Sequence, residues 1–196
     1  MAVIVLNWEL GADLGHITRL IPIAEGLRSH GHRPVLAMRD LSRAEALIGG
    51  AFPVVQAPIW SARVSGLPSE INFTETLFRF GYLQPGGLTG LCRAWRTLWS
   101  VLDARLLLFD QAPTAMLAAR GLDLPRVNLG NSFANPPRRT PLPPYRFWGS
   151  ASSDQVRLAE TEQRALRNAN QVLERLEAPR LASVSDLFRV DRTFLC

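Results

Sequence analysis

Two residues that lie far apart in the sequence, His16 and Asp110, could together carry out acid–base chemistry. His16 ends the glycine-containing segment GADLGH, which follows an apolar run, and Asp110 directly follows the apolar run RLLLF. A neutral imidazole accepts a proton from a hydroxyl group, and a neighbouring carboxylate fixes its tautomer and stabilises the imidazolium that forms. If the fold brings both side chains together, the pair predicts general-base catalysis on a hydroxyl group.

The elements around these residues indicate an alternating α/β chain. Short apolar segments typical of buried strands lie at residues 2–6, 34–38, 53–56, 105–109 and 125–129. Segments with helical spacing lie between them at residues 17–27, 44–48 and 113–120, and Pro22 is expected in or near the first turn of its helix. The alternation predicts right-handed crossovers and a doubly wound, Rossmann-like parallel sheet.

The order of strands in such a sheet explains why His16 and Asp110 should meet. Ligands bind outside the carboxyl ends of the strands, where the strand order reverses, and the first and fourth strands are usually neighbours across that point. The loops after Leu6 and after Phe109 should therefore lie together. His16 would start a helix, where the helix dipole favours the neutral imidazole.

Each of these residues also has a purely structural interpretation. His16 could be a polar residue satisfied in a turn, and Asp110 could cap the helix that begins near Pro113. Glu9 and Asp13 are alternative carboxylate partners for the histidine, or ordinary loop charges.

Composition and missing motifs argue against several other functions. The chain has a formal charge of +5, but all 22 basic residues are arginines scattered along the sequence, which disfavours nucleic-acid binding. Gly11 and Gly15 lack the GxGxxG spacing of a dinucleotide site, and no GxxxxGK[ST] phosphate loop occurs. His30 and His32 flank a helix-ending glycine, and the two cysteines offer neither a disulfide framework nor zinc ligands, so no metal is expected.

The chain is expected to be a cytoplasmic protein. Its first apolar run is followed at once by Asn7, Trp8 and Glu9, without a basic leader or a cleavage site. No apolar run approaches the ~20 residues of a transmembrane segment.

Residues 1–196 are expected to form a single domain with two interruptions of the alternating pattern. Residues 58–104 carry helical patterns, and the proline-rich residues 130–149 are predicted to form an ordered loop or lid. Three arginines of that loop either contact an anionic ligand or only keep the loop solvated. They are Arg138, Arg139 and Arg146. A last helix then precedes a strand-like run at 193–196. Both interruptions should leave from the functional edge of the sheet and help to line an apolar acceptor pocket, for which the candidate residues are Trp8, Glu9, Gly15, Trp60 and Phe133.

Two stretches resemble a known family. Residues 11–37, GADLGHITRLIPIAEGLRSHGHRPVLA, resemble the amino-terminal segment of GT-B glycosyltransferases related to UDP-glucuronosyl and UDP-glucosyl transferases, where a glycine loop ending in Gly-His leads into a helix. Residues 109–130, FDQAPTAMLAARGLDLPRVNLG, are similar to the segment of that family in which an aspartate precedes a helix and a proline-led strand. The resemblance implies the acceptor-binding half of a hexosyltransferase.

The resemblance also implies a reaction. The histidine that matches His16 deprotonates an acceptor hydroxyl, and the aspartate that matches Asp110 supports it. The hydroxyl attacks the anomeric carbon of a nucleotide sugar, for which a UDP-sugar is expected, with inversion and without a metal or cofactor. The acceptor would be a small or lipid-like molecule.

The resemblance leaves the donor side of such an enzyme without a counterpart. The donor-binding carboxyl-terminal domain of the family has no match in this sequence, so a further domain or a partner chain is expected. Whether it is a truncation or one half of a two-chain enzyme, this chain alone should have little or no activity. Two other functions stay open, a non-catalytic remnant that binds an apolar ligand and the nucleotide-binding domain of a Rossmann-type oxidoreductase or epimerase.

Overall fold

A parallel sheet forms the centre of the molecule in the computed structural model, which describes residues 1–11, 14–131, 135–146 and 152–195. Its six strands follow the order β3-β2-β1-β4-β5-β6. They are β1 (Val3–Trp8), β2 (Arg33–Met38), β3 (Val54–Gln56), β4 (Ala104–Asp110), β5 (Arg126–Gly130) and β6 (Arg192–Leu195). Strands β1 and β4 are neighbours, with Trp8 in register with Asp110, so the predicted fold class and the reversal of strand order between them are confirmed.

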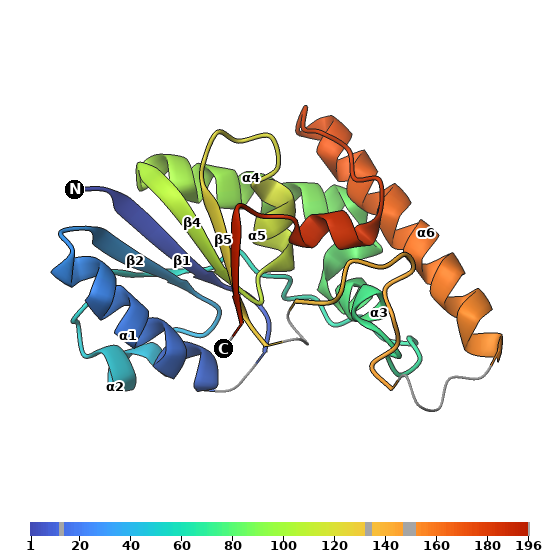
Figure 1. Ribbon diagram of the computed structural model, residues 1–196, viewed down its shortest axis with the longest axis horizontal. Coiled ribbons are helices and arrows are strands. Elements are labelled where there is room, and N and C mark those ends of the chain that lie inside the picture. Colours follow the sequence, from blue (N-terminus) through green and yellow to red (C-terminus); the bar gives the residue numbers. More distant parts are fainter. Residues whose placement is uncertain (12–13, 132–134, 147–151, 196) are drawn as a thin grey trace.

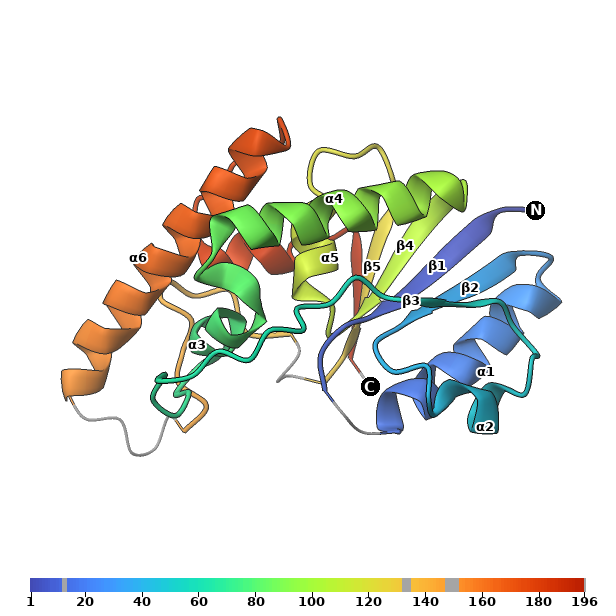
Figure 2. The same ribbon diagram turned by 180° about the vertical axis from the view of Figure 1, so that it is seen from behind.

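Helices cover both faces of this sheet (Figure 1, Figure 2). On one face lie α1 (Gly15–Ser29) and α2 (Ala44–Ile48), and on the other lie α4 (Pro85–Val101) and α5 (Pro113–Ala118). Because successive side chains of a strand point to opposite faces, Val5 and Leu6 of β1 belong to two different buried apolar clusters. The sheet is therefore doubly wound.

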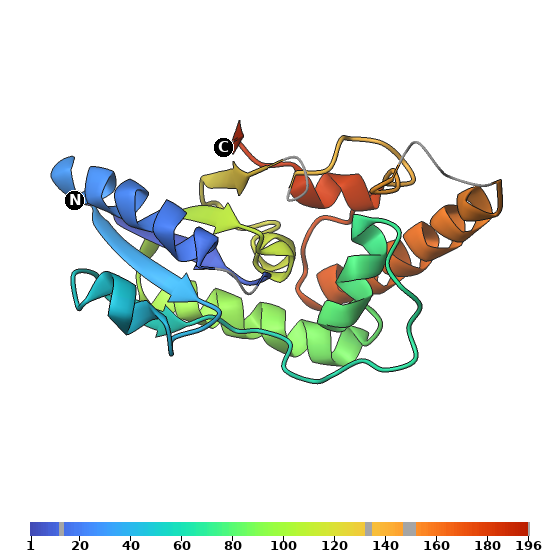
Figure 3. The ribbon, with the colours of Figure 1, turned by 90° about the horizontal axis from the view of Figure 1, so that it is seen from below.

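The residues between β3 and β4 form a helical layer, as the spacing of their apolar residues predicts. They supply α3 (Phe73–Leu77), a short irregular turn η1 (Phe78–Tyr82) and α4. The long helix α6 (Ser152–Arg175) packs against α3 and α4, and η2 (Val184–Phe188) leads from it to β6 (Figure 3). Thr74 in α3 donates a hydrogen bond to the buried Glu162 of α6 at 2.9 Å.

The described part of the proline-rich segment is an ordered loop on these helices. Leu142 is buried, and its carbonyl accepts a hydrogen bond from the Asn72 side chain at 2.9 Å. The Tyr145 N–H donates to the carbonyl of Ile71 at 2.8 Å. Residues 135–146 are therefore tied to the segment that leads into α3.

Two expectations about individual elements need correction. Pro22 lies in the interior of α1 rather than in its first turn, because the helix begins already at Gly15. Strand β1 runs to Trp8 rather than ending at Leu6, because the Asn7 side chain donates to the carbonyls of Val5 and Leu108, each at 2.9 Å. A polar residue is thus fully satisfied inside the sheet. Among the described helices, none is both long and apolar enough to cross a membrane.

Candidate active site

His16 and Asp110 lie side by side at the carboxyl edge of β1 and β4. Nδ1 of His16 is 2.9 Å from Oδ2 of Asp110. The Asp110 side chain is fully buried, whereas that of His16 is 11% exposed. Because a carboxylate only accepts hydrogen bonds, Nδ1 carries the proton, and a neutral imidazole then has its lone pair on Nε2. This is the arrangement of a proton acceptor with its orienting carboxylate.

Asp110 does not cap helix α5, which was its alternative role. Helix α5 is preceded by Ala112 and has no side-chain cap at that position. The side-chain contacts of Asp110 are with His16 and Arg19. The alternative partner Glu9 faces α5 instead of the histidine, and Asp13 lies outside the described residues.

Trp8 supports the imidazole from the end of β1. The two rings stack with their centroids 5.2 Å apart and their planes 20° apart. The indole N–H donates to the carbonyl of Leu10 at 2.6 Å, and Trp8 is 1% exposed. Trp8 therefore fixes the plane of the His16 ring and presents almost no surface to a ligand.

Gly11 leaves Nε2 of His16 uncovered. Its backbone has a φ of +86°, and a Cβ atom built on it would stand 2.5 Å from Nε2. Within the described ranges, Nε2 has no hydrogen-bond partner. The lack of a side chain at position 11 therefore keeps a Cβ atom from crowding Nε2.

Gln111 borders the same space and was not identified from the sequence. It is not a glycine, yet it has a φ of 47°, and its carbonyl accepts a hydrogen bond from the Leu10 N–H at 2.9 Å. Its Oε1 lies 3.2 Å from the point where a Gly11 Cβ would stand. Such left-handed backbone costs energy in residues with a side chain and gathers at functional sites. The carboxamide of Gln111 and Nε2 of His16 thus converge above Gly11.

Arg19 is the second residue that sequence reasoning missed. Its Nη1 donates to Oδ1 of Asp110 at 3.0 Å. Arg19 follows His16 by three residues on α1, and residues at this spacing share one face of a helix. That spacing was a usable signal, whereas nothing local in the sequence marks Gln111.

Glu9 joins the loop after β1 to the start of α5. Its Oε2 accepts hydrogen bonds from the backbone N–H groups of Thr114 at 2.8 Å and Ala115 at 3.3 Å. The carboxyl group is fully buried, and burial raises its pKa from 4.5 to about 7. Because Glu9 has no exposed surface, it ties the loop after β1 to α5 and does not form the predicted contact with an acceptor.

The remaining predicted acceptor contacts are placed only in part. Trp60 is partly buried and lies against two glycines, because Cβ atoms built on Gly81 and Gly87 would stand 2.6 and 2.7 Å from its ring. Gly15 starts α1 with open space above it. Phe133 lies outside the described residues.

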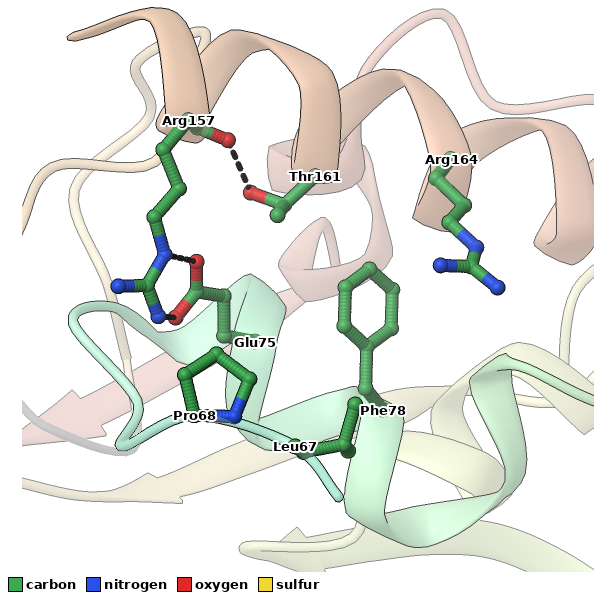
Figure 4. A pocket seen from close by; sticks show the side chains of 7 residues that line it. All are labelled: Leu67, Pro68, Glu75, Phe78, Arg157, Thr161 and Arg164. Atoms are coloured by element: carbon green, nitrogen blue, oxygen red, sulfur yellow. Dashed lines mark hydrogen bonds and ion pairs between the residues drawn. The ribbon is translucent and has the colours of Figure 1, made fainter. Parts of the chain in front are cut away.

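The described residues offer no cluster of three or more His, Cys, Asp or Glu side chains suited to a metal ion. A cavity of about 140 Å³ lies between the α3 region and α6, where Arg157 donates to Glu75 at 2.7 Å (Figure 4). Ligand pockets usually reach ~300 Å³ or more, so this cavity is too small for a sugar acceptor. Its lining residues are Leu67, Pro68, Glu75, Phe78, Arg157, Thr161 and Arg164.

Solved structures share this fold. The glycotransferase of kitacinnamycin matches 99% of this chain with 45% of its own, at a TM-score of 0.58 and 17% identity. Glycosyltransferase VinC, solved in complex with dTDP, matches 97% of this chain with 48% of its own, at a TM-score of 0.54 and 13% identity. The chain therefore spans about half the length of these proteins. No protein-family model matches the sequence, and no curated protein matches it either.

Proposed function

Because residues 1–196 have the fold of one half of a GT-B glycosyltransferase, we propose that they bind the acceptor and supply the catalytic base of an inverting glycosyltransferase. The observation that carries the proposal is the hydrogen bond between His16 Nδ1 and the buried Asp110, which leaves the lone pair of a neutral imidazole on Nε2. This pair lies at the point in the sheet where ligands of doubly wound folds bind.

In the proposed reaction, an acceptor hydroxyl gives its proton to His16 Nε2. Its oxygen attacks the anomeric carbon of the donor from the face opposite the diphosphate. The new C–O bond forms as the bond to the diphosphate breaks, and the nucleoside diphosphate leaves with the electron pair. Asp110 stabilises the imidazolium until it returns the proton to solvent. The configuration at the anomeric carbon is inverted.

The donor is proposed to be a nucleotide sugar held by a domain outside residues 1–196. The chain spans about half the length of its structural neighbours, so an α/β unit that holds the donor fits the other half. VinC was solved in complex with dTDP, which is a pyrimidine nucleotide like UDP. Both UDP-sugars and dTDP-sugars are therefore proposed as donors. Trp60 and Phe133 stay predicted contacts of a small or lipid-like acceptor.

Sugar transfer by a joined protein tests this proposal. Residues 1–196 would be joined to a donor-binding domain, in the full-length protein or as a fusion, and incubated with UDP- or dTDP-sugars and a panel of hydroxylated apolar acceptors. Release of nucleoside diphosphate and a hexose mass increment on the acceptor measure the reaction. His16→Ala should lower kcat at least ~100-fold, the usual contribution of a general base. Asp110→Asn should lower kcat by roughly 10²–10⁴-fold, because it favours the wrong tautomer.

The double variant and a control make the result interpretable. His16→Ala combined with Asp110→Asn should be no slower than His16→Ala alone, since the two residues act as a unit. Arg28→Ala, on the exposed end of α1, should keep the wild-type rate. A His16→Ala enzyme within ~10-fold of the wild-type rate would contradict the general-base role. Acceptor binding that is insensitive to His16, without sugar transfer, would favour the binding remnant instead.

A further inference from the structure

We propose that Arg19 is a positioning residue of this site, which holds Asp110 in the orientation that directs Nε2 of His16 toward the acceptor. The inference rests on the proposed function, because it gives a role to a residue beside the general base. Arg19 does not contact the reacting atoms in this assignment. It acts on His16 through Asp110.

Asp110 divides its two oxygens between two residues of α1. Oδ2 pairs with His16 Nδ1 at 2.9 Å, and Oδ1 accepts from Arg19 Nη1 at 3.0 Å. The terminal torsion of an aspartate is broad, so a carboxylate held at one oxygen can rotate. The second bond restricts this rotation. Arg19 therefore sets the direction in which the first bond points.

The imidazole is then held in two complementary ways. Stacking on Trp8, with planes 20° apart, fixes the plane of the ring. Stacking alone would still let the imidazole turn within its own plane. The hydrogen bond from Nδ1 to Asp110 restricts this turning. Because Nε2 lies on the far side of the ring from Nδ1, turning Asp110 would swing Nε2 away from its place beside Gly11.

Arg19 also balances a buried charge. The Asp110 side chain is fully buried, whereas the Arg19 side chain is 28% exposed. A buried carboxylate with only a neutral imidazole beside it would be an uncompensated charge, which is costly. The positive charge of Arg19 balances the negative charge of Asp110, so His16 does not need a second proton, on Nε2, to balance it. The neutral imidazole is the form that can accept the proton of a hydroxyl group.

The position of Arg19 on its helix agrees with this role. It is the fifth residue of α1 and follows His16 by three residues, so both side chains leave the same face of the helix toward Asp110.

The tautomer of His16 in the 196-residue chain tests the proposal without any substrate. ¹⁵N NMR of the ring nitrogens at mildly alkaline pH reports which nitrogen carries the proton, and the His16 signals are those missing from His16→Ala. The wild type should be protonated on Nδ1. Arg19→Ala should lower the ratio of Nδ1–H to Nε2–H tautomers by roughly 10-fold or more, as for the loss of a hydrogen bond to a charged group. Arg19→Lys should restore most of the ratio.

The matched control is Arg28→Ala on the same helix, for which the tautomer ratio should equal that of the wild type. If Arg19→Ala lowers only the thermal midpoint and leaves the ratio unchanged, Arg19 is a structural partner and the inference is overturned, while the general base stands. If the wild type carries its proton on Nε2, the proposed function itself fails. If Arg19→Ala does not fold, Arg19→Lys is compared with Arg19→Gln, whose side chain is a neutral hydrogen-bond donor. Equal ratios of Nδ1–H to Nε2–H tautomers in these two variants would overturn the positioning role.

Discussion

The backbone of Gly11 lies against the imidazole of His16, so closely that a Cβ atom built on Gly11 would stand 2.5 Å from Nε2. Gly11→Ala is therefore expected to displace the imidazole. It also puts a side chain on a residue with a φ of +86°, which costs about 1–2 kcal/mol. Urea unfolding should show this loss of stability, and carbethoxylation of His16, mapped by mass spectrometry, should report the displaced ring through a changed rate.

Gly15→Ala is the matched control for Gly11→Ala. A Cβ atom at Gly15 meets no other atom within 4 Å, and the residue belongs to α1. Its substitution should leave the stability unchanged or raise it by up to about 1 kcal/mol, from helix propensity. If Gly11→Ala behaved like Gly15→Ala in both measurements, the close approach of Gly11 to His16 would be irrelevant to the site.

Glu9 predicts a pH-dependent loss of stability. Burial raises its pKa from 4.5 to about 7, so the folded state favours the protonated carboxyl. This contribution is present in full below about pH 4.5, decreases as the pH rises, and is lost above about pH 7. The neutral variant Glu9→Gln keeps an acceptor for the Thr114 N–H. Relative to this variant, the wild type should lose about 3 kcal/mol of unfolding free energy across that range.

Denaturant unfolding over a series of pH values measures the effect of Glu9. The exposed Glu25→Gln on α1 controls for the loss of a carboxylate without burial. Its curve should run parallel to that of the wild type. Parallel curves for Glu9→Gln as well would mean that the buried carboxyl does not change its protonation in this range.

The pairing of His16 with Asp110 could be predicted because it follows from rules of topology. Both residues come after apolar strands, and the strand order of a doubly wound sheet makes these two strands neighbours. Helical spacing likewise predicted the helices between β3 and β4. The length of β1 could not be read in this way, because Asn7 is satisfied by carbonyls of its own strand and of β4.

The parts of the site that were missed depend on contacts between loops. Gln111 adopts its left-handed backbone where the loop after β1 meets the loop after β4, and its carbonyl accepts from the Leu10 N–H. Glu9 is predicted as an acceptor contact or an alternative partner of the histidine, but its carboxyl group accepts from the first turn of a helix that starts more than a hundred residues later in the chain. Local patterns carry no information about such contacts. Arg19 differs, since its spacing from His16 already placed both on one helix face.

At position 111, the usual order of stability between alanine and glycine variants should be reversed. At ordinary positions alanine is more stable than glycine, by roughly 0.5–1 kcal/mol. With a φ of 47° at Gln111, the order should invert, and Gln111→Gly should be more stable than Gln111→Ala by about 1 kcal/mol. The same pair of substitutions at the exposed Arg93 of α4 should keep the ordinary order. Finding the ordinary order at both positions would refute strain at Gln111.

A substitution at Gly87 of α4 should disturb Trp60, whereas one at Gly90 of the same helix should not. A Cβ atom on Gly87 would stand 2.7 Å from the indole ring, whereas a Cβ atom on Gly90 meets no other atom within 4 Å. Gly90→Ala should therefore gain up to about 1 kcal/mol from helix propensity. Gly87→Ala should lose this gain and a further 1–3 kcal/mol or so through overpacking, and the tryptophan fluorescence should change as the ring moves. Equal stability of the two variants, with unchanged fluorescence, would show that Trp60 is not held by this glycine and that its orientation toward a predicted acceptor is set elsewhere.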